Sequence, residues 1–185
     1  MPDRSREANP LKRIMFVCSG NICRSPLAHA VFADLVKHAG ASDRYLIESS
    51  GTSAYHVGDQ ADLRMRQTAN NHGIALDHRA RQLIHQDLEE YDMILVMDRS
   101  NYAEVRSLAS FQSLASGKHY LSKVRMYRDF DPSVRKGERW AEVPDPYYGD
   151  TGDFERVFEI VLRTSRNLLA VLERGDAGSD VQENG

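Results

Sequence analysis

The sequence predicts an α/β fold of three layers, α/β/α, in which helices cover both faces of a four-stranded parallel sheet. Short apolar runs of strand type alternate along the chain with longer segments of helical character, an order typical of parallel sheets. The chain has 185 residues, of which 41% are hydrophobic and 28% charged, the composition of an ordinary globular protein. This length corresponds to a single domain with a core of its own.

The strands are expected where apolar and β-branched residues cluster. The run 13–17 marks the first strand, and the segment 92–97 is apolar enough to be buried on both faces. We predict strands at residues 12–17, 45–49, 92–97 and 124–127.

Helices are expected between these strands. The first begins at Ser25, a typical N-cap residue, with Pro26 as its first helical residue, and ends at Gly40. The last has one apolar stripe, which we assign to the core. We predict helices at residues 26–38, 59–72, 82–89, 99–109 and 154–172.

The chain is expected to contain three parts. We predict a flexible N-terminal extension over residues 1–11, a single domain over residues 12–173, and a disordered tail over residues 174–185, which is polar and rich in glycine. The serine-rich segment 107–123 is too short to hold a structural repeat.

Charge and composition exclude several classes of function. The net charge of −3 argues against nucleic-acid binding, and no apolar stretch is long enough to span a membrane. Residues 1–10 lack the apolar core of a signal peptide, so we expect a cytoplasmic protein, with export by another route left open. We also expect a monomer. No spacing among the 2 cysteines and 7 histidines supports a zinc site, and we predict neither a metal nor a cofactor.

The loop at residues 18–25 connects the first predicted strand to the first predicted helix. Unpaired N–H groups and the helix dipole favour an anion at such a crossing. Gly20 and Asn21 are residue types that tolerate a positive φ, which turns successive N–H groups inward around an anion. We therefore predict that the loop binds phosphate through Ser19, Gly20, Asn21, Ile22, Cys23, Arg24 and Ser25.

Two side chains of this loop have catalytic character. A cysteine at a helix N-terminus beside a guanidinium ionises more easily than a free one, so Cys18 is a candidate nucleophile. The other interpretation of Cys18 is a small buried apolar residue. Arg24 presents a planar fork of donors that suits two phosphoryl oxygens.

The segment 17–26, VCSGNICRSP, closely resembles the phosphate loop of the low-molecular-weight protein tyrosine phosphatases of bacterial type. Three later segments resemble the same family in the same order: 49–54 (SSGTSA), 77–82 (DHRARQ) and 143–149 (VPDPYYG). Four ordered motifs within residues 12–173 argue against coincidence. We expect the strand order 2-1-3-4 of a flavodoxin-like or Rossmann-like fold.

The resemblance implies an enzyme that hydrolyses phosphotyrosine through a cysteinyl-phosphate on Cys18, with Arg24 binding the phosphoryl group. A tyrosine leaving group has a pKa of ~10, so its departure needs a general acid. Asp145 is the candidate, on a loop stiffened by Pro144 and Pro146. The alternative is that Asp145 only forms a turn.

Further residues are expected to support the loop. The Ser25 hydroxyl is near enough in sequence to hydrogen-bond the thiolate, and Asp98 follows the third strand at the same sheet edge. The resemblance implies that Asn21, Ser49 and His78 form a network that braces the loop. Ser49 could instead bond to its own backbone, and His78 could be a surface histidine.

The family resemblance also suggests which residues select the substrate. It implies that the side chains of Ile22, Tyr55, Tyr147 and Tyr148 line a cleft deep enough for a phenyl ring. The shorter side chain of phosphoserine would then not reach the Cys18 thiolate. The tyrosines could also be ordinary surface residues. Relatives that act on phosphoarginine typically carry threonine at the position of Ile22, so the isoleucine indicates phosphotyrosine.

Alternative functions remain open at this point. Thioredoxin-coupled arsenate reductases share the loop, but they need further cysteines, and none follows Cys23. A protein arginine phosphatase and a non-catalytic phosphoprotein-binding module are the others. The expected partners are tyrosine-phosphorylated proteins, and the resemblance suggests an autophosphorylating bacterial tyrosine kinase. Cys23 could form a protective disulfide with Cys18 or simply pack as a small residue.

Overall fold

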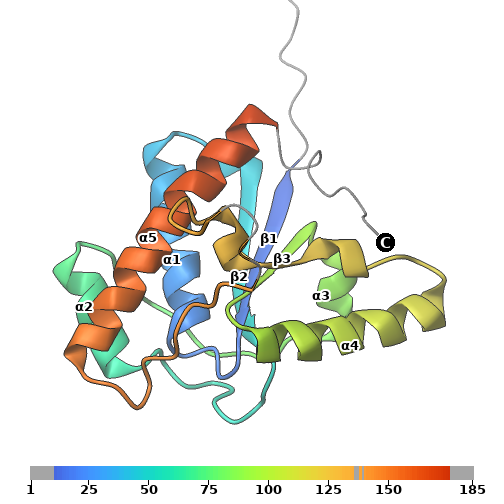
Figure 1. The fold of residues 1–185 in the computed structure, drawn as a ribbon, viewed down its shortest axis with the longest axis horizontal. Coiled ribbons are helices and arrows are strands. Elements are labelled where there is room, and N and C mark those ends of the chain that lie inside the picture. Colours follow the sequence, from blue (N-terminus) through green and yellow to red (C-terminus); the bar gives the residue numbers. More distant parts are fainter. Residues whose placement is uncertain (1–10, 136–137, 139, 176–185) are drawn as a thin grey trace, which may run out of the picture.

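The computed structural model describes residues 11–135, 138 and 140–175, and its central element is a parallel sheet of four strands in the order β2-β1-β3-β4 (Figure 1). This confirms the predicted architecture and strand order. The strands are β1 (Lys12–Cys18), β2 (Tyr45–Gly51), β3 (Met93–Val96) and β4 (Val124–Met126). In the register, Cys18 is opposite Gly51 and Val17 is opposite Val96, so the carboxyl ends of three strands meet at one edge.

Helices cover both faces of the sheet (Figure 1). One face carries α1 (Arg24–His38), α2 (Leu63–Asn71) and α5 (Thr151–Arg174), and the other carries α3 (His85–Glu90) and α4 (Arg99–Ser116). Short 3-10 helices occupy Ser42–Arg44, Leu121–Lys123 and Tyr127–Phe130.

Strand β1 divides the core into two clusters because its side chains alternate between the faces of the sheet. Phe16 packs toward α1 and α5, with ring centroids 5.9 Å from Phe32 and 5.4 Å from Tyr127. Met15 and Val17 pack in the cluster on the α4 side. Each such large apolar side chain contributes about 1.5–3 kcal/mol on full burial, so β1 and the loop after it are held from both sides.

Several helix boundaries differ from the prediction. α1 begins at Arg24, with Cys23 rather than Ser25 in the N-cap position. α2 begins at Leu63 rather than at residue 59, because the Asp62 carboxylate caps it. α3 covers His85–Glu90 rather than 82–89.

The last two helices are longer than predicted. α4 continues to Ser116 instead of ending near residue 109, and it stops at Gly117, whose φ of 71° is left-handed. α5 begins after its cap Asp150 and runs through Arg174, so the predicted tail at 174–185 starts inside the helix. Residues 176–185 of that tail and residues 1–10 of the predicted extension lie outside the described residues.

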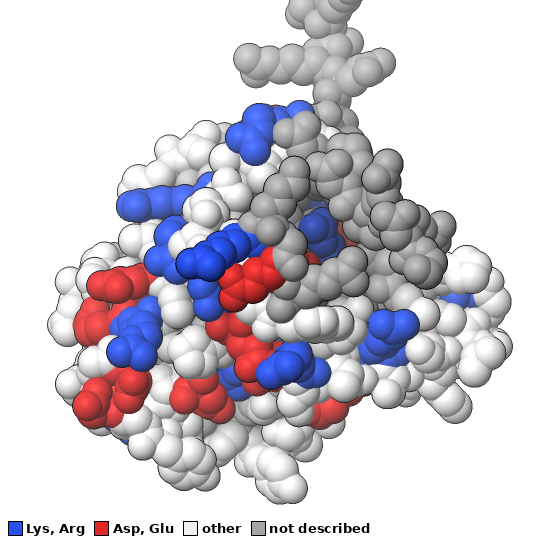
Figure 2. Space-filling view, in the orientation of Figure 1, with Lys and Arg blue, Asp and Glu red and all other residues white. Residues whose placement is uncertain are grey.

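The surface that Figure 2 presents carries acidic and basic side chains next to one another rather than a patch of one charge. Over the part of the chain that the structure describes, no helix is long and apolar enough to cross a membrane.

Candidate active site

The loop after β1 brings Cys18 to the start of α1, where the first-turn N–H groups have no partner within the helix. Cys18 is buried, with 3% of its surface exposed. Its Sγ accepts a hydrogen bond from the Asn21 N–H at 3.3 Å and lies 3.1 Å from Ser25 Oγ. The sulfur therefore lies beside one N–H donor and one hydroxyl, at the end of the helix that favours negative charge.

Asn21 connects the loop to two other segments. Its φ of 55° is left-handed, and its side chain is fully buried. The amide Nδ2 donates to Ser25 Oγ at 2.8 Å and to Ser49 Oγ at 3.1 Å. Its Oδ1 accepts from the Arg81 N–H at 2.9 Å, and its carbonyl accepts from His78 Nε2 at 2.8 Å. The structure thus brings Asn21, Ser25, Ser49 and His78 together, and it adds Arg81, whose part in this network no sequence pattern had indicated.

Gly20 in the loop and Gly51 beside it are both closely approached by other groups, and neither has a positive φ. The loop uses the left-handed conformation at Asn21, and Gly20 does not have it. A Cβ at Gly20 would lie 3.0 Å from Cδ2 of His56, and one at Gly51 would lie 2.6 Å from the backbone oxygen of Ser19. Gly51, at the end of β2, therefore lets β2 pass directly against the loop.

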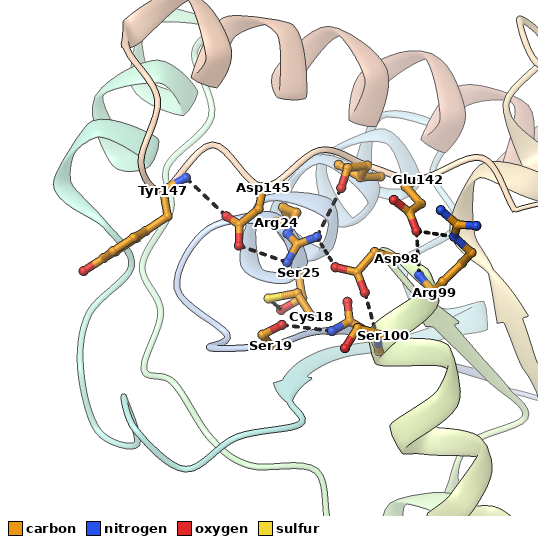
Figure 3. Close-up of polar contacts among 12 residues, drawn as sticks. Cys18, Ser19, Arg24, Ser25, Asp98, Arg99, Ser100, Glu142, Asp145 and Tyr147 are labelled. Carbon is orange, nitrogen blue, oxygen red and sulfur yellow. Dashed lines mark hydrogen bonds and ion pairs between the residues drawn. The ribbon is translucent and has the colours of Figure 1, made fainter.

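Arg24 lies in the first turn of α1, with only 3% of its surface exposed, between two carboxylates (Figure 3). Its Nη1 donates to Asp98 Oδ2 at 2.7 Å and to the Val143 carbonyl at 3.1 Å, and its Nη2 donates to Asp145 Oδ2 at 3.3 Å. Burial opposes the charged form, but the negative charges of Cys18 and the two carboxylates outweigh it and raise the pKa of Arg24. The guanidinium is a permanent, oriented cation beside the sulfur.

Asp145 reaches the same cation from the segment between β4 and α5. The segment is anchored where the Val143 N–H donates to the Met97 carbonyl at 2.8 Å. Asp145 has a half-exposed side chain, and its Oδ1 accepts from the Tyr147 N–H at 3.2 Å. The carboxyl group thus forms a local turn and also faces Arg24 (Figure 3).

A cavity of about 220 Å³ opens over Cys18 and Arg24. It is lined by residues of the phosphate loop and of the segment that carries Asp145. The four predicted rim residues, Ile22, Tyr55, Tyr147 and Tyr148, all line it. The rings of Tyr147 and Tyr148 pack edge to face, with centroids 4.9 Å apart. Ser53, which belongs to the 49–54 motif but had no predicted role, also lines the cavity, as does His56, which lies outside all four motifs.

Cys23 also lines this cavity, and both cysteines are free thiols. Burial, followed by the nearby charges of Asp62 and Cys18, raises the pKa of Cys23 far above its usual value. Cys23 is therefore a neutral thiol.

Asn101 is a further residue of the site that no sequence pattern had indicated. It is fully buried in the first turn of α4, and its Nδ2 donates to Ser19 Oγ at 3.0 Å. Together with Asp98, the cap of α4, it ties that helix to the phosphate loop. Among the described residues, no group of three or more His, Cys, Asp or Glu side chains could hold a metal ion.

Comparison with known proteins identifies the family to which this chain is similar. Residues 13–177 match the family described as "Low molecular weight phosphotyrosine protein phosphatase". The chain is 39% identical over 160 residues to a low molecular weight protein-tyrosine-phosphatase of Streptomyces coelicolor, which covers 86% of this chain and 93% of that protein. It is 37% identical over 158 residues to a low molecular weight phosphotyrosine protein phosphatase of Rattus norvegicus. That match covers 85% of this chain and 94% of the rat protein. A crystal structure of a protein tyrosine phosphatase from Entamoeba histolytica has a TM-score of 0.80 at 36% identity, covering 89% of this chain and 99% of that one.

Proposed function

The chain belongs to the low molecular weight phosphotyrosine protein phosphatase family and is a phosphomonoester hydrolase, and from this premise we propose that it hydrolyses phosphotyrosine in proteins through a cysteinyl-phosphate. One observation carries the mechanism. A buried cysteine and a buried arginine of one loop line a small cavity together with a half-exposed aspartate, which lies 121 residues beyond that arginine in the sequence.

In the first step, Cys18 Sγ attacks the phosphorus while Arg24 and the N–H groups of the loop hold the phosphoryl oxygens. The S–P bond forms as the bond from phosphorus to the tyrosine oxygen breaks. Asp145 gives its proton to that oxygen, so that tyrosine leaves as a neutral phenol. A positioned acid of this kind contributes typically about 10² to 10⁴ in rate.

In the second step, Asp145 is a carboxylate and accepts a proton from a water molecule that attacks the phosphorus. The S–P bond breaks, inorganic phosphate forms and the Cys18 thiolate leaves. Ser25 Oγ and the Asn21 N–H, which contact Sγ at 3.1 and 3.3 Å, stabilise the leaving thiolate. Phosphate oxygens compete with Asp145 for Arg24, whose contact with that carboxylate is the longer of its two ion pairs.

The lining of the cavity supports an aryl substrate. The side chain of Ile22 and the rings of Tyr147 and Tyr148 provide apolar surface at its mouth, and such surface binds a phenyl ring better than a short aliphatic phosphoester. The substrates that fit are tyrosine-phosphorylated proteins. A redox function coupled to thioredoxin is not favoured, because the sequence holds 2 cysteines, Cys18 and Cys23, and the second is a buried neutral thiol.

The test compares the hydrolysis of a phosphotyrosyl peptide with that of a phosphoarginyl peptide by the wild type, Cys18→Ser and Asp145→Asn. Cys18→Ser should be inactive, and Asp145→Asn should lose about 10² to 10⁴ in turnover of the phosphotyrosyl peptide. Cys23→Ser is the matched control in the same loop and should stay within about tenfold of the wild type, because Cys23 performs no step. Turnover by Cys18→Ser would exclude the covalent mechanism, and a preference for phosphoarginine would overturn the substrate assignment.

A further inference from the structure

Arg64, at the start of α2, connects the two loops of the active site. Its Nη2 donates to the backbone carbonyl of Tyr147 at 2.9 Å. Tyr147 is two residues beyond Asp145, and its own N–H donates to Asp145 Oδ1 at 3.2 Å. The guanidinium therefore holds the peptide segment that in turn orients the carboxyl group.

The other end of this connection is the phosphate loop. Arg64 binds Asp62 in a bidentate manner, with Nε 3.1 Å from Oδ1 and Nη2 2.8 Å from Oδ2. The backbone N–H of Asp62 donates to the carbonyl of Ile22 at 2.8 Å. A continuous chain of hydrogen bonds thus runs from Ile22 through Asp62, Arg64 and Tyr147 to Asp145.

The position of the guanidinium is fixed by packing as well as by hydrogen bonds. Its Cζ lies 4.6 Å from the ring centroid of Phe154, a fully buried residue of α5, and 5.6 Å from that of Tyr147. The hydrogen bond from Arg64 lowers the pKa of Asp62, so the pair stays ionised. A lysine could not reproduce this, because a planar fork is needed to bind a carboxylate, reach a carbonyl and stack on a ring at once.

We propose that Arg64 is a positioning residue for the general acid. It holds the segment 143–147, which carries Asp145, in the correct position relative to the phosphate loop. This inference rests on the proposed function. The segment before Asp145 is fixed by the hydrogen bond from the Val143 N–H to the Met97 carbonyl. The segment after Asp145 is fixed by the hydrogen bond from Arg64 to the Tyr147 carbonyl. Without Arg64 that segment is free to shift, and a displacement of about 1 Å from the productive geometry can cost up to about hundredfold in rate.

A misplaced acid has a specific kinetic signature. An aryl phosphate with a good leaving group needs little protonation, whereas one with a poor leaving group depends on it. Removing a positioning residue for the acid should therefore steepen the dependence of kcat/KM on the leaving group. A general loss of structure would lower kcat/KM for all substrates alike.

The experiment measures kcat/KM for dinitrophenyl, para-nitrophenyl and phenyl phosphate with the wild type, Arg64→Ala, Arg64→Lys, Asp145→Asn and Arg66→Ala. Arg64→Ala and Arg64→Lys should lose about tenfold to hundredfold on phenyl phosphate and less than about threefold on dinitrophenyl phosphate. Arg66→Ala is the matched control, because Arg66 lies on the same helix and its Nε donates to the Ala61 carbonyl. It should follow the wild type across the series.

The outcomes separate this inference from the proposed function. One outcome is that Asp145→Asn steepens the dependence of kcat/KM on the leaving group while both Arg64 variants keep the same dependence as the wild type. In that case Arg64 does not position the acid. A full recovery in Arg64→Lys would overturn the need for a planar fork. If Asp145→Asn itself leaves the dependence unchanged, the assignment of Asp145 as the acid fails instead. Thermal unfolding of each variant, with Arg64→Gln as a further substitution, separates loss of position from loss of fold.

Discussion

Cys18 Sγ and Ser25 Oγ lie 3.1 Å apart across the mouth of the phosphate loop, and Ser25 is fully buried. The same hydroxyl accepts from Asn21 Nδ2 at 2.8 Å and lies 3.2 Å from the carbonyl of Ser50. A hydroxyl has one proton to donate, so that proton goes either to the Ser50 carbonyl or to the sulfur. A negative charge on the sulfur draws it to Cys18, because hydrogen bonds to charged groups are the stronger ones.

Ser25→Ala should therefore slow the release of Cys18 from the cysteinyl-phosphate. A hydrogen bond to a charged group is worth about 1.5–3 kcal/mol, which corresponds to roughly tenfold to hundredfold in rate. We expect kcat for para-nitrophenyl phosphate to fall by this factor and a burst of para-nitrophenol to appear in rapid-mixing experiments. Ser100→Ala, at an exposed position on α4 where the hydroxyl contacts Glu104, is the control and should behave as the wild type. A fall in kcat without a burst would contradict the role of Ser25 in the second step.

Gly51→Ala should damage the site although the substitution lies outside the phosphate loop. The added Cβ would be 2.6 Å from the Ser19 backbone oxygen and 3.1 Å from the Asn21 nitrogen. Backbone atoms cannot rotate away as a flexible side chain can, so the loop must shift. We expect a loss of about 1–3 kcal/mol in the free energy of unfolding and a loss of activity larger than tenfold.

Gly58→Ala is the comparison for Gly51. No atom lies within 4 Å of a Cβ at Gly58, but its φ of 89° is strained for alanine. That variant should lose stability with little change in kcat/KM, measured by urea unfolding and by turnover of para-nitrophenyl phosphate. Equal activity in Gly51→Ala and the wild type would show that the loop tolerates the displacement.

The parts of the molecule that the sequence predicts are those fixed by local pattern and by topology. A parallel sheet places the residues that follow its strands at one edge, which is why Asp98 and the loop that begins at Cys18 could be expected together before the structure. The contacts of Arg64 with Tyr147 and of Asn101 with Ser19 depend on the exact path of loops and helices. No spacing in the sequence encodes them.

The predicted end of α4 comes too early for a definable physical reason. Residues 107–123 are rich in serine, which competes with helical hydrogen bonds and favours turns. In the structure these serines bond back to the helix instead, with Ser113 Oγ 2.7 Å from the Ala109 carbonyl and Ser116 Oγ 2.8 Å from the Gln112 carbonyl. The helix ends only at Gly117, where the left-handed conformation is accessible.

Asp98 performs two tasks, which two substitutions separate. Its Oδ1 accepts from the Asn101 N–H at 2.7 Å as the cap of α4, and its Oδ2 accepts from Arg24 at 2.7 Å. Asp98→Asn keeps a capping oxygen but loses the charge, so it should lower kcat/KM while the free energy of unfolding changes little. Asp98→Ala should lower kcat/KM as well and cost about 1 kcal/mol more in unfolding. Equal unfolding free energies for the two variants in urea would rule out the capping role.

Asp131 should make the protein less stable in acid. Its carboxylate is buried, and it accepts from Arg163 Nε at 2.7 Å, Ser133 Oγ at 2.8 Å and Arg128 Nε at 2.9 Å. Burial opposes ionisation, but these hydrogen bonds outweigh it and hold the pKa of Asp131 well below its usual value. The folded pKa is thus lower than the unfolded value of ~3.9, so this stabilisation is present above about pH 4 and is lost as the pH falls further.

Asp131→Asn tests this link between charge and stability. At pH 7 the variant should be less stable than the wild type by about 2 kcal/mol, less than for a fully buried pair because Arg163 is partly exposed. The difference should shrink below about pH 4, where the wild type also loses the charge. Asp129→Asn is the contrasting control, because burial raises the pKa of Asp129. Its folded pKa lies above the unfolded one, so its ionisation costs stability, and Asp129→Asn should gain stability relative to the wild type as the pH rises toward 7. Urea unfolding of the three proteins from pH 3 to pH 7 measures both slopes, and slopes of the same sign would contradict the assignment.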